Sequence, residues 1–160
     1  SSPHSETSMN RVETPIVVDW GAKYDYYCSD ITRTAFYGKP DKKFIDCYKA
    51  VLDANQTAIE NITDKTFTND ADAFARDLLI KDGIGENFTH SLGHGVGLEI
   101  HEYPTLSPKK RQKLENGMVF TIEPGVYFAG EFGIRIEDVV MLKDGKTIRL
   151  YTDDKNLKIL

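Results

Sequence analysis

The chain has 160 residues, a length that fits a single domain and allows a substantial hydrophobic core. Its 40% hydrophobic and 28% charged residues are typical of a globular protein, and its net charge of −5 argues against a nucleic acid or an anionic membrane as partner. No apolar run approaches the roughly 18 residues of a membrane span, and the N-terminus lacks signal-peptide features, so we expect a cytoplasmic protein.

The first half of the chain predicts a hairpin followed by helices. Residues 15–38 are rich in Val, Ile, Tyr, Thr and Phe with a polar interruption, which is typical of a β-hairpin. Apolar residues recur at helical spacing over 41–62 and predict an amphipathic helix that packs on the sheet. A second helix is expected from about Asn69, with Thr68 as its cap, to Gly83, because glycine suits a left-handed helix end.

The second half predicts mostly strands. A short helix is expected to begin at Ser107 and Pro108 and to end at Gly117. Elements before and after it have the pattern of strands, around residues 88–100, 118–123, 132–142 and 146–151. This order implies hairpins rather than alternating βαβ units, so we expect the α+β class, with an antiparallel sheet covered by helices.

Asp19 and Asp30 lie in the two arms of the predicted hairpin. If the turn is centred on Tyr24 and Asp25, the two carboxylates face each other directly, with Cβ atoms about 4.5–5.5 Å apart. Like charges at that distance repel and raise a pKa unless a cation lies between them.

Glu123 and Glu137 form a second acidic pair. A three-residue turn at 129–131 would place them opposite each other, although Pro124 and Gly125 interrupt the strand and weaken this register.

The apolar context of these acids argues for a function. A single Asp or Glu is usually a turn residue or is exposed to solvent. Asp19, however, follows IVV, Glu123 follows MVFTI, and Glu137 lies between Ile136 and two valines. A carboxylate buried in such a place is costly unless it is paired or binds a metal.

Three of the four histidines fall in HSLGHGVGLEIHE, residues 90–102. His94 lies between two glycines, which leave room for its side chain to reach a metal. His90 lies four residues before it and His101 seven after it, so a regular strand would turn His101 to the opposite face. A structural, hydrogen-bonded role and a functional role stay equally open for His90 and His101.

Four carboxylates and one imidazole form a hard, oxygen-rich ligand set. Such a set does not suit a structural zinc site but suits two divalent ions, with Mn or Co expected and Zn or Fe as alternatives. Two ions share ligands by bridging, and a water between them loses its proton near neutral pH and becomes a nucleophile. The residues therefore predict metal-assisted hydrolysis.

Four motifs, VVDWGAKYDYYCSDITRT, HSLGHGVGLEIHEYP, TIEPGVY and GIRIEDVV, together resemble the pita-bread metallopeptidases. The resemblance is greatest to Xaa-Pro dipeptidases (prolidases) and aminopeptidase P, and it extends from His4 to about residue 142. One motif alone is weak, whereas four in order are specific. The resemblance implies the pita-bread fold and hydrolysis of Xaa-Pro bonds in dipeptides or at peptide N-termini.

The resemblance also implies a set of metal ligands, which are Asp19, Asp30, His94, Glu123 and Glu137. Asp30 and Glu137 would bridge the two ions, Asp19 would hold one of them, and His94 with Glu123 would hold the other. Glu123 would also carry a proton from the water to the leaving amine.

Four further residues have roles implied by the resemblance. His101 resembles the histidine that donates to the scissile carbonyl or the tetrahedral intermediate. His4 resembles a substrate-binding, catalytic histidine from the loop before the first metal strand, and His90 resembles the histidine near the substrate carboxylate and proline ring. Arg135, on the same strand face as Glu137, would steady the site or bind a substrate carboxylate.

The chain departs from the family pattern in two places. From the resemblance, we expect the helices and strand that open the first half of the pita-bread fold to be missing from this chain. We expect the same of the N-terminal domain that prolidases use to line the pocket and to dimerise. We therefore expect residues 1–160 to be a partial, C-terminal catalytic domain of a homodimeric protein that takes peptide substrates. The isolated chain is expected to have little or no activity.

Three alternatives stay open. Methionine aminopeptidases share the five ligands, but the short spacing from Glu123 to Glu137 and the GLEIHEYP motif favour the proline-specific branch. Creatinase-like amidinohydrolases share the fold without needing a metal, so the complete ligand set argues against them. A non-catalytic pita-bread module that binds peptides or proteins is the third, although such modules lose ligand residues.

Overall fold

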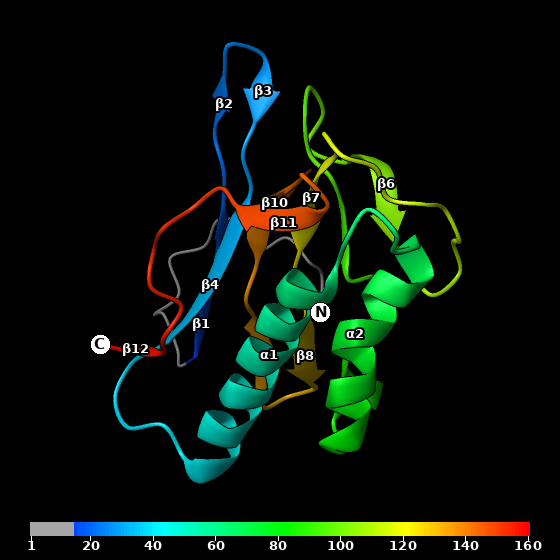
Figure 1. The fold of residues 1–160 in the computed structure, drawn as a ribbon. Helices are drawn as coiled ribbons and strands as arrows, with labels where there is room; N and C mark the ends of the chain where they lie inside the picture. The colour runs from blue at the N-terminus through cyan, green and yellow to red at the C-terminus, as the bar shows by residue number, and fades with distance from the viewer. Residues whose placement is uncertain (1–14) are drawn as a thin grey trace.

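The computed structural model describes residues 15–160, in which two helices lie against a set of mostly antiparallel strands (Figure 1). The elements in chain order are β1 Ile16–Trp20, β2 Lys23–Tyr24, β3 Tyr27–Cys28, β4 Ile31–Phe36, α1 Lys42–Asn61, α2 Thr68–Lys81, the 3-10 helix η1 Gly85–Asn87, β5 Gly93–Gly95, β6 Glu102–Leu106, β7 Val119–Ile122, β8 Gly125–Phe128, β9 Phe132–Arg135, β10 Asp138–Lys143, β11 Lys146–Arg149 and β12 Lys158–Ile159. The α+β class expected from the sequence is confirmed.

The strands form two larger sheets and two hairpins. The first sheet has the order β1-β4-β12 and the second the order β11-β10-β7-β5-β6, while β2 pairs with β3 and β8 with β9. All pairs are antiparallel except β12 with β4. The β2–β3 hairpin projects away from the helices at the top of Figure 1.

The β8–β9 hairpin continues the ladder of β7 and β10. Ile122 pairs with Asp138 at the end of one ladder, and Gly125 pairs with Arg135 at the start of the next, in the same register. The four strands therefore form one long ribbon with a short interruption. An isolated bridge from Thr32 of β4 to Glu137 joins the first sheet to this interruption.

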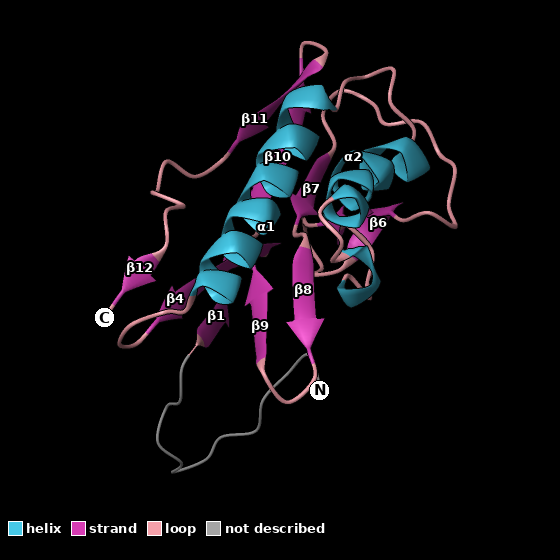
Figure 2. Ribbon diagram, turned by 90° about the horizontal axis from the view of Figure 1, so that it is seen from below, coloured by secondary structure: helices cyan, strands magenta, loops and turns pink. Residues whose placement is uncertain are grey.

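The two helices lie side by side on one face of the strands (Figure 2). Asp41 caps α1, because its carboxylate accepts a hydrogen bond from the Phe44 backbone N–H at 2.7 Å. The apolar face of α1 then packs on the strands. Helix α2 ends at Lys81, and Gly83 follows with a φ of +76°, as the sequence predicts.

The hydrophobic core fills the space between the helices and the long ribbon. Its fully buried members come from both layers and include Val51, Ala54 and Ala58 of α1, Ala71, Ala75 and Leu79 of α2, and Phe120, Ile122, Val126, Ile134, Val140 and Leu142 of the strands. Within residues 15–160 no helix is both long enough and apolar enough to cross a membrane.

The short helix expected at 107–117 is wrong. These residues form turns, and residues 112 and 114 pair with the start of α2 through their backbone. Thr68 donates its N–H to the Gln112 carbonyl oxygen at 2.8 Å, and Leu114 donates to the Thr66 carbonyl at 2.9 Å. Thr68 is the first residue of α2, and Phe67 occupies the cap position. The Thr68 hydroxyl donates to the Lys110 carbonyl at 2.7 Å.

The predicted strands differ from the structure in two further respects. The strand expected around 88–100 is reduced to β5, because bends occupy the residues on both sides of it. Strands β6 and β12 had no predicted counterpart.

Candidate metal centre

Asp19 lies in β1 and Asp30 immediately precedes β4, but the two do not face each other. Asp19 pairs with Thr32, so the register predicted from a turn at Tyr24 and Asp25 is wrong by two positions. The turn is centred on Asp25 and Tyr26, whose φ angles are +45° and +71°. A shift of two keeps both carboxylates on the same side of the ladder, because side chains alternate with a period of two.

Glu123 and Glu137 lie at the interruption of the long ribbon. The predicted register is found in the ladders on both sides of them, and the three residues 129–131 form the turn that was expected. The N–H of Glu123 donates to the Leu92 carbonyl at 2.8 Å, and the N–H of Glu137 donates to the Thr32 carbonyl at 3.0 Å. Each glutamate is thereby tied to a neighbouring strand or loop.

His94 is in the middle of β5, and the glycines on either side of it have a steric cause. A Cβ at residue 93 would lie 2.0 Å from the Thr121 carbonyl oxygen, and one at residue 95 would lie 2.1 Å from the Tyr103 carbonyl oxygen. Because β5 lies between β6 and β7, only glycine allows the strands to approach this closely. The glycines thus let the His94 ring enter the site from a central strand.

Ligand atoms of Asp30, His94 and Glu137 lie within 4.8 Å of one another. His94 Nε2 is 3.2 Å from Glu123 Oε1 and 3.8 Å from Asp30 Oδ2. The chain therefore brings Asp30, His94, Glu123 and Glu137 into one cluster, although the four residues come from three separate parts of the sequence. Asp19 adjoins this cluster through Arg135, whose guanidinium forms an ion pair with its carboxylate.

The pKa values of two carboxyls show that the charged forms are disfavoured in this cluster. Burial and the negative charge of Asp19 raise the pKa of Asp30 to about 6. Burial, with the charges of Glu123 and Asp30, raises the pKa of Glu137 to about 8. Both shifts have the direction expected when carboxylates crowd together without a cation between them. A divalent ion would remove that repulsion, so these donors fit a hard metal ion.

The pKa of His94 has two opposed influences. Burial lowers it, but the hydrogen bond to the Glu123 carboxylate and that to the Gly95 carbonyl outweigh burial, so the pKa is raised. His94 Nδ1 lies 3.0 Å from the Gly95 carbonyl oxygen, which places a proton on Nδ1 and leaves Nε2 to face the carboxylates. Nε2 carries the proton of the hydrogen bond to Glu123, and its lone pair would become available to a metal ion once that proton leaves.

A second group of residues surrounds Arg135. His90 Nε2 lies 3.1 Å from the Tyr127 hydroxyl, and Arg135 donates to the same hydroxyl at 3.0 Å. Arg135 Nε also donates to the Thr32 hydroxyl at 3.2 Å, which in turn donates to Glu137 at 2.6 Å. Burial lowers the pKa of His90. The group therefore connects His90 to the acidic cluster through hydrogen bonds.

His101 lies at the exposed side of the cluster, where its ring centroid is 4.0 Å from that of His94. It reaches His94 despite the seven-residue offset, because the chain bends after β5 and does not continue as a strand. His4 falls outside the residues that the structure describes.

Three site residues were missed at the sequence level, namely Thr32, Thr121 and Tyr127. The Thr121 hydroxyl accepts from the His94 N–H at 3.0 Å and donates to Glu123 at 3.0 Å. Thr32 is two residues after Asp30 and Thr121 is two before Glu123, so same-face spacing was an available signal for both.

Comparisons with known proteins give a consistent result. The model of metallopeptidase family M24 matches residues 1–144. The Xaa-Pro dipeptidase of Pyrococcus horikoshii is 41% identical over 157 residues, which are 97% of this chain and 45% of that protein. The solved prolidase of Thermococcus sibiricus has a TM-score of 0.94 and 43% identity, covering 99% of this chain and 44% of that one.

A third relative is named for a different activity. The solved X-Pro aminopeptidase of Thermotoga maritima also has a TM-score of 0.94, at 39% identity, over 99% of this chain and 45% of that one. The chain thus spans a little under half the length of the relatives that it matches. These similarities confirm the fold that the sequence motifs implied.

Proposed function

Because this chain belongs to metallopeptidase family M24, we propose that it carries the metal centre of a peptidase that hydrolyses Xaa-Pro bonds, in dipeptides or at peptide N-termini. The observation that carries the proposal is the convergence of Asp30, His94 and Glu137 ligand atoms within 4.8 Å. Relatives named Xaa-Pro dipeptidase and X-Pro aminopeptidase support the specificity.

Two divalent ions, Mn or Co in our proposal, would occupy the centre. Asp30 and Glu137 would bridge them, Asp19 would hold one, and His94 with Glu123 would hold the other. Burial and neighbouring carboxylates raise the pKa of Asp30 to about 6 and that of Glu137 to about 8, and a shared cation would stabilise both charged forms, which supports cation binding. Bound ions would supply Lewis-acid activation of water and of the scissile carbonyl.

Glu123 would move the proton in this reaction. Its Oε1 accepts from the Thr121 hydroxyl and lies 3.2 Å from His94 Nε2, so its carboxylate is held beside the centre rather than in solvent. From there it would accept a proton from the attacking water and donate it to the leaving amine.

The histidines and Arg135 would act on the substrate and on the ligands. His101, exposed beside His94, would donate to the developing oxyanion, and His90 would line the pocket for the proline side of the substrate. Arg135 is engaged by Asp19, Tyr127 and Thr32, which favours a role in steadying the centre over direct binding of a substrate carboxylate. His4 stays a predicted substrate-binding and catalytic residue.

The proposal is tested on the full-length protein by two measurements. Calorimetric titration of the metal-free protein with Mn(II) should give about two ions per chain. Hydrolysis of Gly-Pro, Leu-Pro and an Xaa-Pro-Xaa tripeptide should then depend on added Mn(II) or Co(II). The relative kcat/KM of dipeptides and tripeptides distinguishes a dipeptidase from an aminopeptidase.

Asp30→Ala provides the decisive variant. It should abolish hydrolysis, because a bridging carboxylate serves both ions. Asp53→Ala, which removes a carboxylate from the exposed side of α1, is the matched control and should keep wild-type activity. Full activity of Asp30→Ala would contradict the bridging role.

A further inference from the structure

Asn55 is a fully buried amide in the middle of α1, on the face that meets the long ribbon. Its Nδ2 donates to the Ile122 carbonyl oxygen at 2.9 Å and to the Ile136 carbonyl oxygen at 3.4 Å. Ile122 is peptide-bonded to Glu123, and Ile136 is peptide-bonded to Glu137. One side chain therefore holds the two peptide units from which both glutamates of the centre extend.

The other end of each peptide unit is held as well. The N–H of Glu123 donates to Leu92 and the N–H of Glu137 donates to Thr32. Asn55 completes the restraint at the carbonyl end of both units. This matters because the ribbon is interrupted here, so the regular ladder of β7 with β10 does not by itself fix how far apart the two glutamates lie.

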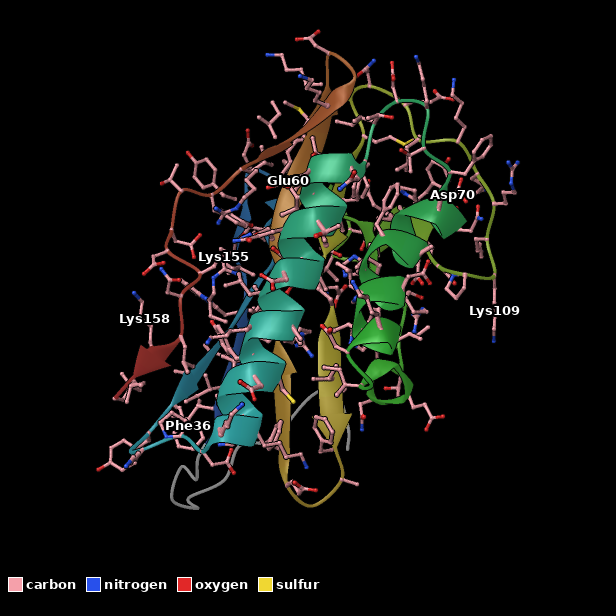
Figure 3. The ribbon with its side chains drawn as sticks, turned by 60° about the horizontal axis from the view of Figure 1, so that its bottom comes forward. Phe36, Glu60, Asp70, Lys109, Lys155 and Lys158 are labelled. Atoms are coloured by element: carbon pink, nitrogen blue, oxygen red, sulfur yellow. The ribbon has the colours of Figure 1, made fainter. Side chains whose placement is uncertain are left out.

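Lys155 fixes the orientation of the Asn55 amide. Its ammonium donates to Asn55 Oδ1 at 2.6 Å and to Asp138 Oδ2 at 2.9 Å. An ammonium only donates and a carbonyl oxygen only accepts, so both neighbours of the amide require the same orientation. Lys155 is 8% exposed, and Figure 3 shows it on the C-terminal segment that runs beside α1.

We infer that Asn55 is a positioning residue that sets the relative placement of Glu123 and Glu137, and that Lys155 keeps its amide in the orientation this requires. The inference rests on the proposed metal centre. It adds to that centre two residues, Asn55 and Lys155, that lie outside the sequence motifs of the ligands. Residues that orient metal ligands without binding the metal themselves typically contribute 10–100-fold to metal affinity or activity. The same scale is expected here.

The test uses Asn55→Asp in the full-length protein. This change keeps the size of the side chain and its acceptor for Lys155 but replaces the donor to the two carbonyls by a repelling oxygen. Mn(II) affinity measured by calorimetry should fall roughly 10–100-fold, and excess Mn(II) should restore much of the kcat for Leu-Pro. A loss through general unfolding would not be reversed in this way.

Asn61→Asp is the matched control. It makes the same amide-to-carboxylate change in the same helix, where the Asn61 amide donates only to the exposed Thr57 carbonyl at 2.8 Å. Its Mn(II) affinity should equal that of the wild type. Equal affinities for wild type, Asn55→Asp and Asn61→Asp would overturn the inference.

A second readout needs no metal. In the metal-free protein, amide hydrogen exchange of Glu123 and Glu137 should accelerate at least about 10-fold in Asn55→Asp, while β10–β11 amides stay protected. Should Asn55→Asp fail to fold, Lys155→Met is measured for the same pair of amides. Unchanged exchange at both glutamates in a folded variant would overturn the inference, whereas absence of Mn(II) binding by the wild type contradicts only the proposed function.

Discussion

At the scale of single residues, Glu137 shows how the centre affects stability. It is 2% exposed, and burial together with Glu123 and Asp30 raises its pKa from an ordinary 4.5 to about 8. The folded state therefore binds this proton more tightly than the unfolded chain does. The resulting stabilisation is complete below about pH 4.5 and is lost as the pH rises through about 8.

Thermal unfolding of EDTA-treated protein tests this sign. Between about pH 5 and about pH 8 the Tm of the wild type should fall relative to that of Glu137→Gln, which has no carboxyl to ionise. Glu60→Gln, an exposed change in α1, should follow the wild type. Parallel curves for the wild type and Glu137→Gln would show that the pKa of this carboxyl is not raised.

His101 gives a prediction about catalysis rather than stability. His101→Ala should lower kcat by on the order of 10²-fold, the usual cost of removing one oxyanion donor. The number of Mn(II) ions bound per chain should stay the same, as measured by calorimetry. Loss of metal instead would mean that His101 is a ligand. Metal content is a meaningful control because the His101 ring lies beside that of His94.

The sequence predicted Glu123, Glu137 and His94 because each interrupts an apolar or glycine-rich segment, whereas Asp30 was chosen from a hairpin register that the structure corrects. It did not predict Tyr127 or the hydroxyls of Thr32 and Thr121, since neutral polar residues are common in strands and carry no cost that marks them. Arg135 was chosen from its spacing to Glu137, but its bonds to Tyr127 and Thr32 depend on the tertiary fold.

At the scale of elements, helix α2 holds the loop that carries His90. Arg76 donates to the Phe88 and His90 carbonyl oxygens, each at 2.8 Å, and forms a two-point ion pair with the fully buried Asp72. Asp72 also accepts from the Leu92 N–H at 3.0 Å. One ion pair in α2 therefore fixes alternate residues of the chain that leads into β5.

Arg76→Met should destabilise the protein by about 3–5 kcal/mol, because it leaves a buried carboxylate without its partner. Urea unfolding gives the value directly. Lys42→Met, which breaks an exposed pair with Asp46 at the same i,i+4 spacing, should cost no more than about 1 kcal/mol. Similar costs for the two variants would mean that the α2 pair has no special structural role.

The long ribbon and the hairpin of β1 to β4 differ in how well the sequence predicted their registers. The turn of the β8–β9 hairpin contains Gly130, with a φ of +76°. This glycine marks the turn in the sequence, and the predicted register was correct. The first turn places Asp25 and Tyr26 at positive φ without a glycine or asparagine to mark it, and the predicted register was wrong by two. The helix predicted at 107–117 was wrong for another reason. Its residues pair with the start of α2, and a local sequence pattern does not show such a long-range contact.

At the scale of the whole molecule, β1 is the edge strand of its sheet among residues 15–160 and keeps large apolar side chains exposed. Val18 is 46% and Trp20 65% exposed. Such an edge favours pairing with another strand. A protein of residues 1–160 alone should therefore self-associate at micromolar concentration, and Val18→Lys should reduce this, as measured by light scattering after size exclusion. A monomer for both proteins would contradict the prediction.

The hydrogen bond from Thr32 to Glu137 spans 105 positions of the chain. During translation, Asp19 and Asp30 leave the ribosome before Glu137 has been synthesised. The nascent chain then has only scattered carboxylates to offer a cation. On this topology the ligand set for the proposed ions is complete only once Glu137 has left the ribosome.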